Sequence, residues 1–183
     1  IALIDTGIDP LHPDFMNPGA SSTHIAQGGQ LLLTSARAFL TNDPEADPCD
    51  VTDEHGHGTH LAGLIAAAAN NGSTAGSGIA GLAYPVRLLP LKVAGADGVA
   101  THADIARAIS YGVDQGATVI LVGFAGPTWS QMLQEAVDYA WDRGCFLVAP
   151  AGDAGPGSPA FPAACPHVFG VASLSASGSL TSY

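Results

Sequence analysis

Short apolar runs alternate with longer amphipathic stretches along most of this chain, and that alternation is the strongest constraint on its fold. Runs of aliphatic and β-branched residues predict strands, whereas apolar residues three and four positions apart predict helices. Residues 118–122 read Thr-Val-Ile-Leu-Val, which is typical of a strand buried on both faces of a parallel sheet. The expected strands are 1–4, 86–93, 118–122, 146–149 and 168–172, and the expected helices are 57–69, 101–113 and 128–143.

This order of elements predicts an α/β fold with a mostly parallel central sheet and helices on both faces. Polar residues mark two helix starts: Thr101 with Asp104 forms a capping-box pattern, and Thr128 is followed by Gln131 at the same spacing. The inner faces predicted from helical spacing are Leu61, Leu64, Ile65 and Ala68; then Ile105, Ala108, Ile109, Gly112 and Val113; and then Leu133, Ala136, Val137, Ala140 and Trp141.

The charge balance excludes two classes of partner. The chain has 183 residues, a net charge of −11 and only five lysines and arginines. Nucleic acids and anionic membrane surfaces are bound through clustered basic residues, so neither is expected as a partner. No apolar run is long enough to span a membrane, and no signal peptide is present. We expect one domain over residues 1–183, incomplete at both ends because the sequence starts and stops inside regular patterns.

The cysteines are Cys49, Cys145 and Cys165, an odd number without metal-binding spacing. One disulfide plus a free thiol stays open on count alone. Cys145 lies in an apolar run, which favours a buried and unreactive thiol.

Asp5 ends the first apolar run and is followed by Thr6 and Gly7. Asp-Thr-Gly occurs in aspartic proteases, in which two carboxylates share a proton, and also around the acid of a Ser-His-Asp triad. The chain has no second Asp-Thr-Gly or Asp-Ser-Gly, and its helices do not suit an all-β protease that dimerises. Asp5 is therefore interpreted as a carboxylate that orients a histidine.

Histidines cluster in the segment DEHGHGTHLAG, residues 53–63. The spacing of His55, His57 and His60 nearly matches the metal-binding run of metallo-β-lactamase-like hydrolases, but those enzymes need an acidic residue where this chain has Thr59. The alternative takes His57 as a catalytic histidine at a helix start, with His55 and His60 supporting that start by hydrogen bonds. We favour it because His60 continues directly into helical spacing.

Several segments together resemble the subtilisin-like serine protease family: ALIDTGID, HGHGTHLAG, GIAGLAYPVRLLPLKVAGADG, LVAPAGDAG and FPAACPHVFGVASLS. The aspartate precedes the histidine, as in that family. The resemblance implies a three-layer α/β/α sandwich in which Asp5 orients His57 and His57 acts as general base and then general acid. It further implies a polypeptide substrate, a secreted or extracytoplasmic location and no required cofactor; a propeptide stays open.

The nucleophile that the resemblance implies is a serine in a Gly-Thr-Ser run that opens a later helix. No serine of this chain has that setting: Ser110 and Ser130 lack the preceding Gly-Thr, and the serines from Ser173 onward lie in a polar stretch like the one before that helix. We expect the nucleophile beyond residue 183, so this chain alone is not expected to hydrolyse peptides. A catalytically silent binding domain is the alternative function, and a metal-dependent hydrolase is the least favoured.

Asp153 stands where the resemblance implies the side-chain donor of the oxyanion hole, which is Asn in most of the family. An ionised carboxylate has no proton to donate to an oxyanion. Three interpretations stay open: Asp153 is protonated at the working pH, turnover is slow or specialised, or the domain is silent.

The resemblance also implies the substrate-binding residues. Substrate would pair by β-augmentation between two main-chain edges, one at Gly98, Val99 and Ala100 and the other at Gly123, Phe124 and Ala125. The primary pocket would have walls at residues 149–152, including Ala151 and Gly152, and at Ala160, without an acidic residue at its base. His102, Ile105 and Phe124 would line a side pocket, although Ile105 fits an ordinary core position equally well.

Residues 70–81 correspond to a loop that binds calcium in some members of the family. Here the loop contains no carboxylate, and calcium prefers several oxygen ligands with charge among them. A structural calcium ion stays open without support, and no other metal site is expected.

Overall fold

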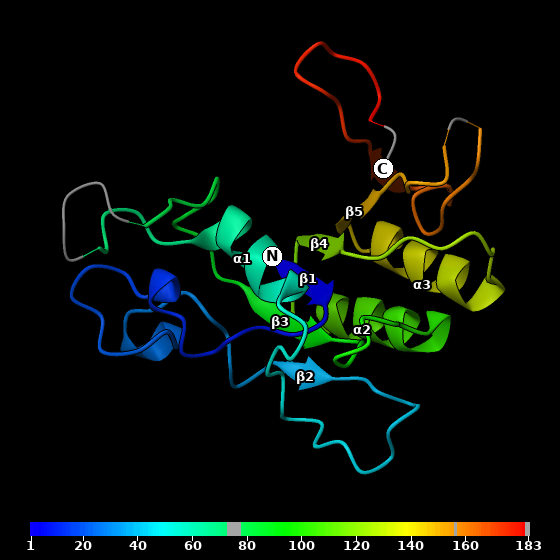
Figure 1. Ribbon diagram of the computed structural model, residues 1–183. Coiled ribbons are helices and arrows are strands. Elements are labelled where there is room, and N and C mark those ends of the chain that lie inside the picture. Colours follow the sequence, from blue (N-terminus) through cyan, green and yellow to red (C-terminus); the bar gives the residue numbers. More distant parts are fainter. Residues whose placement is uncertain (73–77, 156, 182–183) are drawn as a thin grey trace.

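The computed structural model describes residues 1–72, 78–155 and 157–181, and those residues form an α/β fold around one sheet (Figure 1). The six-stranded sheet is parallel throughout and has the strand order β2-β3-β1-β4-β5-β6. β1 comes first in the sequence yet lies between β3 and β4, so its carboxyl end opens near the middle of the sheet edge. The strands are β1 (Ala2–Asp5), β2 (Arg37–Ala38), β3 (Leu89–Lys92), β4 (Val119–Val122), β5 (Phe146–Pro150) and β6 (Val168–Val171).

Helices cover both faces of the sheet. Leu3 belongs to an apolar cluster with residues of α1, whereas Ala2 and Ile4 belong to a second cluster with residues of α2 and α3. Successive side chains of a strand point to opposite faces, so α1 lies on one face and the pair α2 and α3 on the other. The expected three-layer arrangement is therefore confirmed. The helices are α1 (His57–Ala66), α2 (His102–Asp114) and α3 (Gln131–Asp142), with short 3₁₀ turns η1 (Pro13–Phe15) and η2 (Ile25–Gln27).

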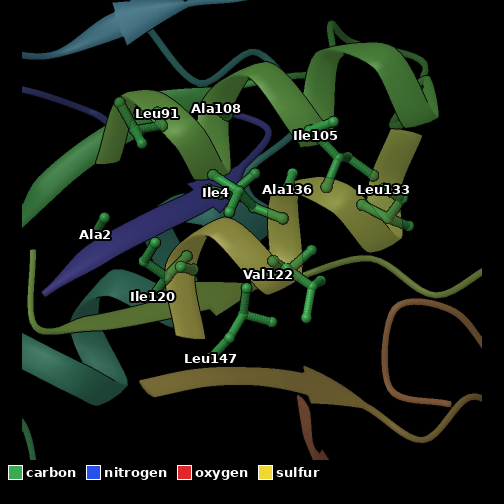
Figure 2. Close-up of a cluster of buried hydrophobic side chains, with 14 of the residues drawn as sticks. Ala2, Ile4, Leu91, Ile105, Ala108, Ile120, Val122, Leu133, Ala136 and Leu147 are labelled. Atoms are coloured by element: carbon green, nitrogen blue, oxygen red, sulfur yellow. The ribbon is translucent and has the colours of Figure 1, made fainter. Parts of the chain in front are cut away.

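The larger core cluster lies between the sheet and the α2–α3 layer (Figure 2). Ile4, Ile120 and Leu133 are fully or almost fully buried there. Burying an aliphatic side chain of this size stabilises a fold by about 1.5–3 kcal/mol. This packing holds β1 and β4 rigidly beneath the edge where Asp5 lies.

Several element boundaries differ from the prediction. α1 ends at Ala66 because Ala67 has an extended ψ of 133°. α3 begins at Gln131 with Ser130 as its cap, so the predicted cap Thr128 is wrong. The cap Thr101 is confirmed, since its hydroxyl accepts the Asp104 N–H at 3.0 Å. The strand β2 was not predicted, because it is only two residues long and contains Arg37.

The inner faces of α1 and α3 were predicted incorrectly at two positions. Leu64 is 52% exposed and Trp141 is 51% exposed, so neither lies in the core. α1 instead buries small residues, and a Cβ on Gly58 would lie 2.1 Å from the carbonyl oxygen of Gly7. Leu61 and Ile65 of α1 pack only partly buried against the apolar cluster that contains Leu3, so small residues make the closest contacts of this helix. Trp141 stacks on His167, with ring centroids 4.6 Å apart.

Strand β4 and the cysteines complete the comparison with the sequence. Ile120 and Val122 are buried whereas the alternate residues of β4 are only half-buried, so the expected burial on both faces holds for one face. All the cysteines are free thiols; Cys49 is exposed and the other two are buried. Burial raises the pKa of the Cys145 and Cys165 thiols, which keeps them protonated. The buried thiol predicted at Cys145 is confirmed. Within the described residues, no helix is long and apolar enough to cross a membrane.

Candidate active site

Asp5 and His57 meet at the carboxyl edge of the sheet. Asp5 is the last residue of β1, and its side chain is only 1% exposed. His57 is the first residue of α1, and its side chain is 43% exposed. One carboxylate oxygen of Asp5, Oδ1, lies 2.8 Å from Nδ1 of His57 and also accepts the Thr6 N–H at 2.7 Å. The predicted contact between these two residues is therefore confirmed. A buried carboxylate on Nδ1 leaves the other ring nitrogen, Nε2, as the one available for proton transfer.

The second oxygen of Asp5, Oδ2, is buried and has no hydrogen-bond partner among the described residues. It lies against the backbone of Gly123, at which a Cβ would come within 1.8 Å of it. The Gly123 N–H is itself bound to the Ile4 carbonyl at 2.9 Å, which fixes this backbone next to β1. The absence of a side chain at Gly123 thus makes the room in which Asp5 lies.

Asp53 organises the start of α1. Its carboxylate accepts five hydrogen bonds: from the hydroxyls of Thr6 and Thr59 and from the N–H groups of His55, Gly56 and Thr59, at 2.7–3.1 Å. Partial burial raises the pKa of this carboxyl, but the hydrogen bonds outweigh burial and hold the pKa well below its ordinary value. Asp53 is therefore ionised, and it satisfies backbone donors that a helix start would otherwise leave unpaired.

Thr6 links Asp5 to the same helix start. Its buried hydroxyl accepts the Gly58 N–H at 2.9 Å and donates toward Asp53 at 2.8 Å. Gly56, the N-cap of α1, has a φ of +94°, a conformation that suits glycine. The chain after β1 and the chain before α1 are thus joined around the Asp5–His57 pair.

The predicted roles of His55 and His60 in this support are wrong. Both side chains are exposed, and within the described part of the chain neither ring forms a hydrogen bond. The helix start is held by Asp53 and Thr6 instead. The role of Asp53 was not predicted, although the sequence contains a signal for it: an aspartate shortly before a helix commonly accepts hydrogen bonds from the N–H groups of the helix start.

Asp153 lies on the surface in the loop after β5 and lines a cleft of about 560 Å³ together with Ala151 and Gly152. Gly152 has a φ of +84°, and a Cβ there would lie 2.6 Å from the Cβ of Ala160, so those two residues pack together. The predicted wall at Ala149 is wrong, because that residue is 1% exposed and belongs to the core. The rest of the cleft is lined by Ala154, Gly155, Gly157, Ser158, Ala172, Ser173, Leu180 and Thr181.

The two predicted main-chain edges follow β3 and β4. Gly98, with a φ of +68°, packs against the His55 ring, whose Nε2 lies 2.9 Å from the position of a Cβ at Gly98. Val99 is exposed, and Ala100 packs against the larger core cluster together with Phe124.

Beyond Gly123, Phe124 and Ala125, the second edge ends in an antiparallel bridge. The Gly126 N–H donates to the Phe161 carbonyl at 3.0 Å, and the Phe161 N–H donates back at 2.8 Å. His102 is the first residue of α2, and its Nε2 lies 3.9 Å from the position of a Cβ at Gly126. Ile105 is 4% exposed, so it is a core residue rather than part of a side pocket.

Comparison with known proteins identifies this arrangement. The sequence profile of the subtilase family matches residues 1–183. The chain belongs to the subtilase family. The similarity extends to structure: a solved structure described as "S41 Psychrophilic Protease" matches with a TM-score of 0.74 and 34% identity, over 94% of this chain and 52% of that one.

This subtilase chain spans about half the length of the curated relatives it matches. It is 34% identical to thermitase of Thermoactinomyces vulgaris and covers 57% of that protein. It is 36% identical to a thermophilic serine proteinase of Bacillus sp. (strain AK1), of which it covers 40%, and 33% identical to the major intracellular serine protease of Bacillus subtilis (strain 168), of which it covers 53%. All of this chain takes part in each of these matches.

Two possible metal sites, one on the histidine segment and one at residues 70–81, can be compared with the structure of this subtilase. Nδ1 of His57 is occupied by Asp5, and residues 1–72, 78–155 and 157–181 contain no group of three or more His, Cys, Asp or Glu side chains arranged to hold a metal ion. A metal centre built on the histidine segment thus has no support. For the loop at residues 70–81 a structural calcium ion was left open without support, and residues 73–77 of that loop lie outside the described residues.

Proposed function

We propose that the full-length protein is a serine endopeptidase that hydrolyses polypeptides. The observation that carries this proposal is the contact between the buried Asp5 carboxylate and Nδ1 of His57, at 2.8 Å. Two of the relatives are named as serine proteases, which supports the same reaction.

In the proposed reaction, His57 accepts the proton of a serine hydroxyl through Nε2 as the serine attacks the peptide carbonyl. Asp5 holds the Nδ1–H tautomer and stabilises the imidazolium that forms. His57 then gives the proton to the departing amine. Water then attacks the acyl-serine ester with His57 again as general base, which releases the acid product and restores the serine. The serine is proposed to lie beyond residue 183. Apart from this water, the reaction uses only side chains and backbone groups of the protein, so it needs no cofactor.

A catalytically silent subtilase domain that binds polypeptides is the second candidate, and Asp153 is the observation that favours it. Asp153 is exposed at the cleft, where an ionised carboxylate repels an oxyanion instead of donating to it. Asp5 and His57 would then keep their geometry without supporting turnover.

The two candidates are separated by an assay on the full-length protein. We expect a fluorophosphonate, which reacts with an activated serine, to label the wild type, and we expect peptide hydrolysis. His57→Ala should abolish labelling, and Asp5→Asn should lower kcat by about 10⁴-fold, as in another Asp-His-Ser protease. Asp47→Asn, in an exposed loop, is the matched control. Absence of both labelling and hydrolysis in the wild type, with peptide binding retained, would establish the silent domain instead.

The proposal extends to substrate, propeptide and location. Ala151 and Gly152 at the cleft support a preference for apolar residues before the cleaved bond. By family resemblance we also propose a propeptide and a location outside the cytoplasm. One relative is named as an intracellular protease, so the location is measured by fractionating cells and medium and detecting the full-length protein.

A further inference from the structure

Lys92 is a buried cation beside the Asp5–His57 pair that the proposed reaction does not use. It is the last residue of β3, is 4% exposed and lies in register with Asp5 on the neighbouring strand. Leu91 and Val93, which flank it, are core residues. A charge is costly to bury unless it is paired or hydrogen-bonded, so the contacts of this ammonium group show what holds it there.

Those contacts join the two segments that carry the site. Nζ of Lys92 donates to the Thr6 carbonyl at 2.9 Å and to the Thr52 carbonyl at 2.7 Å. Thr6 directly follows Asp5, and Thr52 directly precedes Asp53. The ammonium group thus links the end of β1 to the loop that precedes α1, through one backbone carbonyl oxygen of each segment.

The charge of Lys92 also opposes the acidic groups around His57. The Asp5 carboxylate contacts the His57 ring. The hydroxyl of Thr6 lies within hydrogen-bonding distance of both the Asp5 and the Asp53 carboxylates. The exposed Glu54 carboxylate is 3.8 Å from Nζ of Lys92. His55 is a further titratable neighbour of His57, with their ring centroids 6.3 Å apart. The carboxylates favour the imidazolium form of His57, whereas the ammonium group favours the neutral form that acts as a base.

We propose that Lys92 is a positioning residue of the Asp5–His57 pair, which fixes the spacing of the two segments and keeps His57 neutral toward lower pH. The inference rests on the proposed peptidase function of this site. It predicts two separable effects, one that depends on the geometry of the two hydrogen bonds and one that depends on the positive charge alone.

The experiment compares Lys92→Met and Lys92→Arg in the full-length protein. Lys92→Met should lower kcat by about 10–100-fold with KM within about twofold, because a small misplacement of catalytic groups affects turnover rather than binding. It should also move the acid limb of the pH profile upward by on the order of half a unit. Lys92→Arg keeps the charge but not the compact donor geometry, so kcat should fall while the acid limb stays in place.

Arg87→Met is the matched control, since it removes an exposed cation from the segment that leads into β3. It should leave kcat and the acid limb unchanged. A second readout is the titration of His57 by NMR, with the His57 signals assigned by their absence in His57→Ala. This titration reports the effect of Lys92→Met on the protonation of His57 without requiring turnover. If the wild type proves inactive, the peptidase proposal fails, and the NMR titration still decides the role of Lys92.

A Lys92→Met protein with a wild-type acid limb and kcat would overturn the proposal. If Lys92→Met does not fold, Lys92→Arg decides alone: an acid limb displaced as far as half a unit despite the retained charge, or an unchanged kcat, would overturn it. A merely structural role predicts lower thermal stability with no movement of either pH profile.

Discussion

Asp53→Asn tests whether the start of α1 depends on the charge of Asp53. The substitution keeps the size of the side chain but replaces one carboxylate oxygen with an NH₂ group. Oδ2 accepts the N–H and the hydroxyl of Thr59, at 2.8 and 2.7 Å, and an amide NH₂ can accept neither. We therefore expect the Thr59 N–H to lose its partner.

The expected loss of stability follows from these bonds. The unpaired, partly buried Thr59 N–H costs about 1–3 kcal/mol, a range that includes the loss of Asp53 as a helix-capping acceptor. The bonds that remain also lose the strength that an ionised acceptor gives them. Together these effects should cost about 2–3 kcal/mol, which lowers the Tm of a domain of about 150–250 residues by roughly 5–10 °C and that of a longer full-length protein by less.

The pH dependence of this loss has a defined sign. The folded-state pKa of Asp53 is depressed by its hydrogen bonds. Such a group stabilises the fold fully above its unfolded pKa of about 3.9, and that stability is lost as pH falls through the folded value. The difference in stability between wild type and Asp53→Asn should be constant from about pH 5 to 8 and should shrink below about pH 4.

The assay is thermal unfolding of the full-length protein at one scan rate, with a serine-directed inhibitor bound to prevent self-digestion. Asp47→Asn is the control, because its carboxylate is exposed and, within the described residues, accepts one hydrogen bond, from the Cys49 N–H at 2.8 Å. That variant should change stability by less than about 0.5 kcal/mol. An Asp53→Asn protein that melts with the wild type would refute the reasoning, and a difference that persists undiminished at low pH would exclude the charge as its origin.

Three further outcomes are expected of the full-length protein. Gly123→Ala places a Cβ 1.8 Å from Asp5 Oδ2, so the gap must widen by at least 1.2 Å to reach the 3.0 Å that real Cβ atoms keep; kcat/KM should fall by about 10²-fold. Gly126→Ala should leave kcat/KM unchanged, because a Cβ at Gly126 has its nearest neighbouring atom at 3.9 Å. Equal values of kcat/KM for Gly123→Ala and Gly126→Ala would contradict the argument from crowding. Asp153→Asn should raise kcat above about pH 7 by up to about 10²–10³-fold, the loss that subtilisin itself shows without its oxyanion donor; an unchanged pH profile from about pH 4 to 9 would remove Asp153 from the oxyanion hole. A peptide library should be cut mainly after apolar residues, and a majority of cuts after Lys or Arg would oppose that expectation.

The sequence predicted the layers and the Asp5–His57 contact because both depend on local patterns and on topology. Apolar runs announce buried strands, and in a parallel sheet the chain leaves every strand at the same edge. A carboxylate directly after one run and a histidine at the start of a helix therefore have a good chance of meeting. The structure places them 2.8 Å apart across the end of β1.

The packing face of α1 escaped prediction for a physical reason. Periodicity arguments take the largest apolar side chains as the buried ones, but Leu64 is exposed and Ala62 is buried. Gly58 approaches the Gly7 carbonyl so closely that no side chain fits between them. Close approach between the start of α1 and the segment that follows β1 requires small residues, and hydrophobicity alone gives small residues little weight.

The supporting groups of the site escaped prediction for a different reason, although Lys92 carried a signal. A lysine between Leu91 and Val93 in an expected buried strand contradicts the apolar pattern around it. Since burial of an unpaired charge is so costly, such a residue must meet acceptors supplied by other segments, and those acceptors follow from the fold rather than from the local sequence. Here they are the carbonyls of Thr6 and Thr52, beside Asp5 and Asp53. A charge at the carboxyl end of a predicted core strand, next to a strand that carries a catalytic candidate, is thus a reason to look for a support of that candidate.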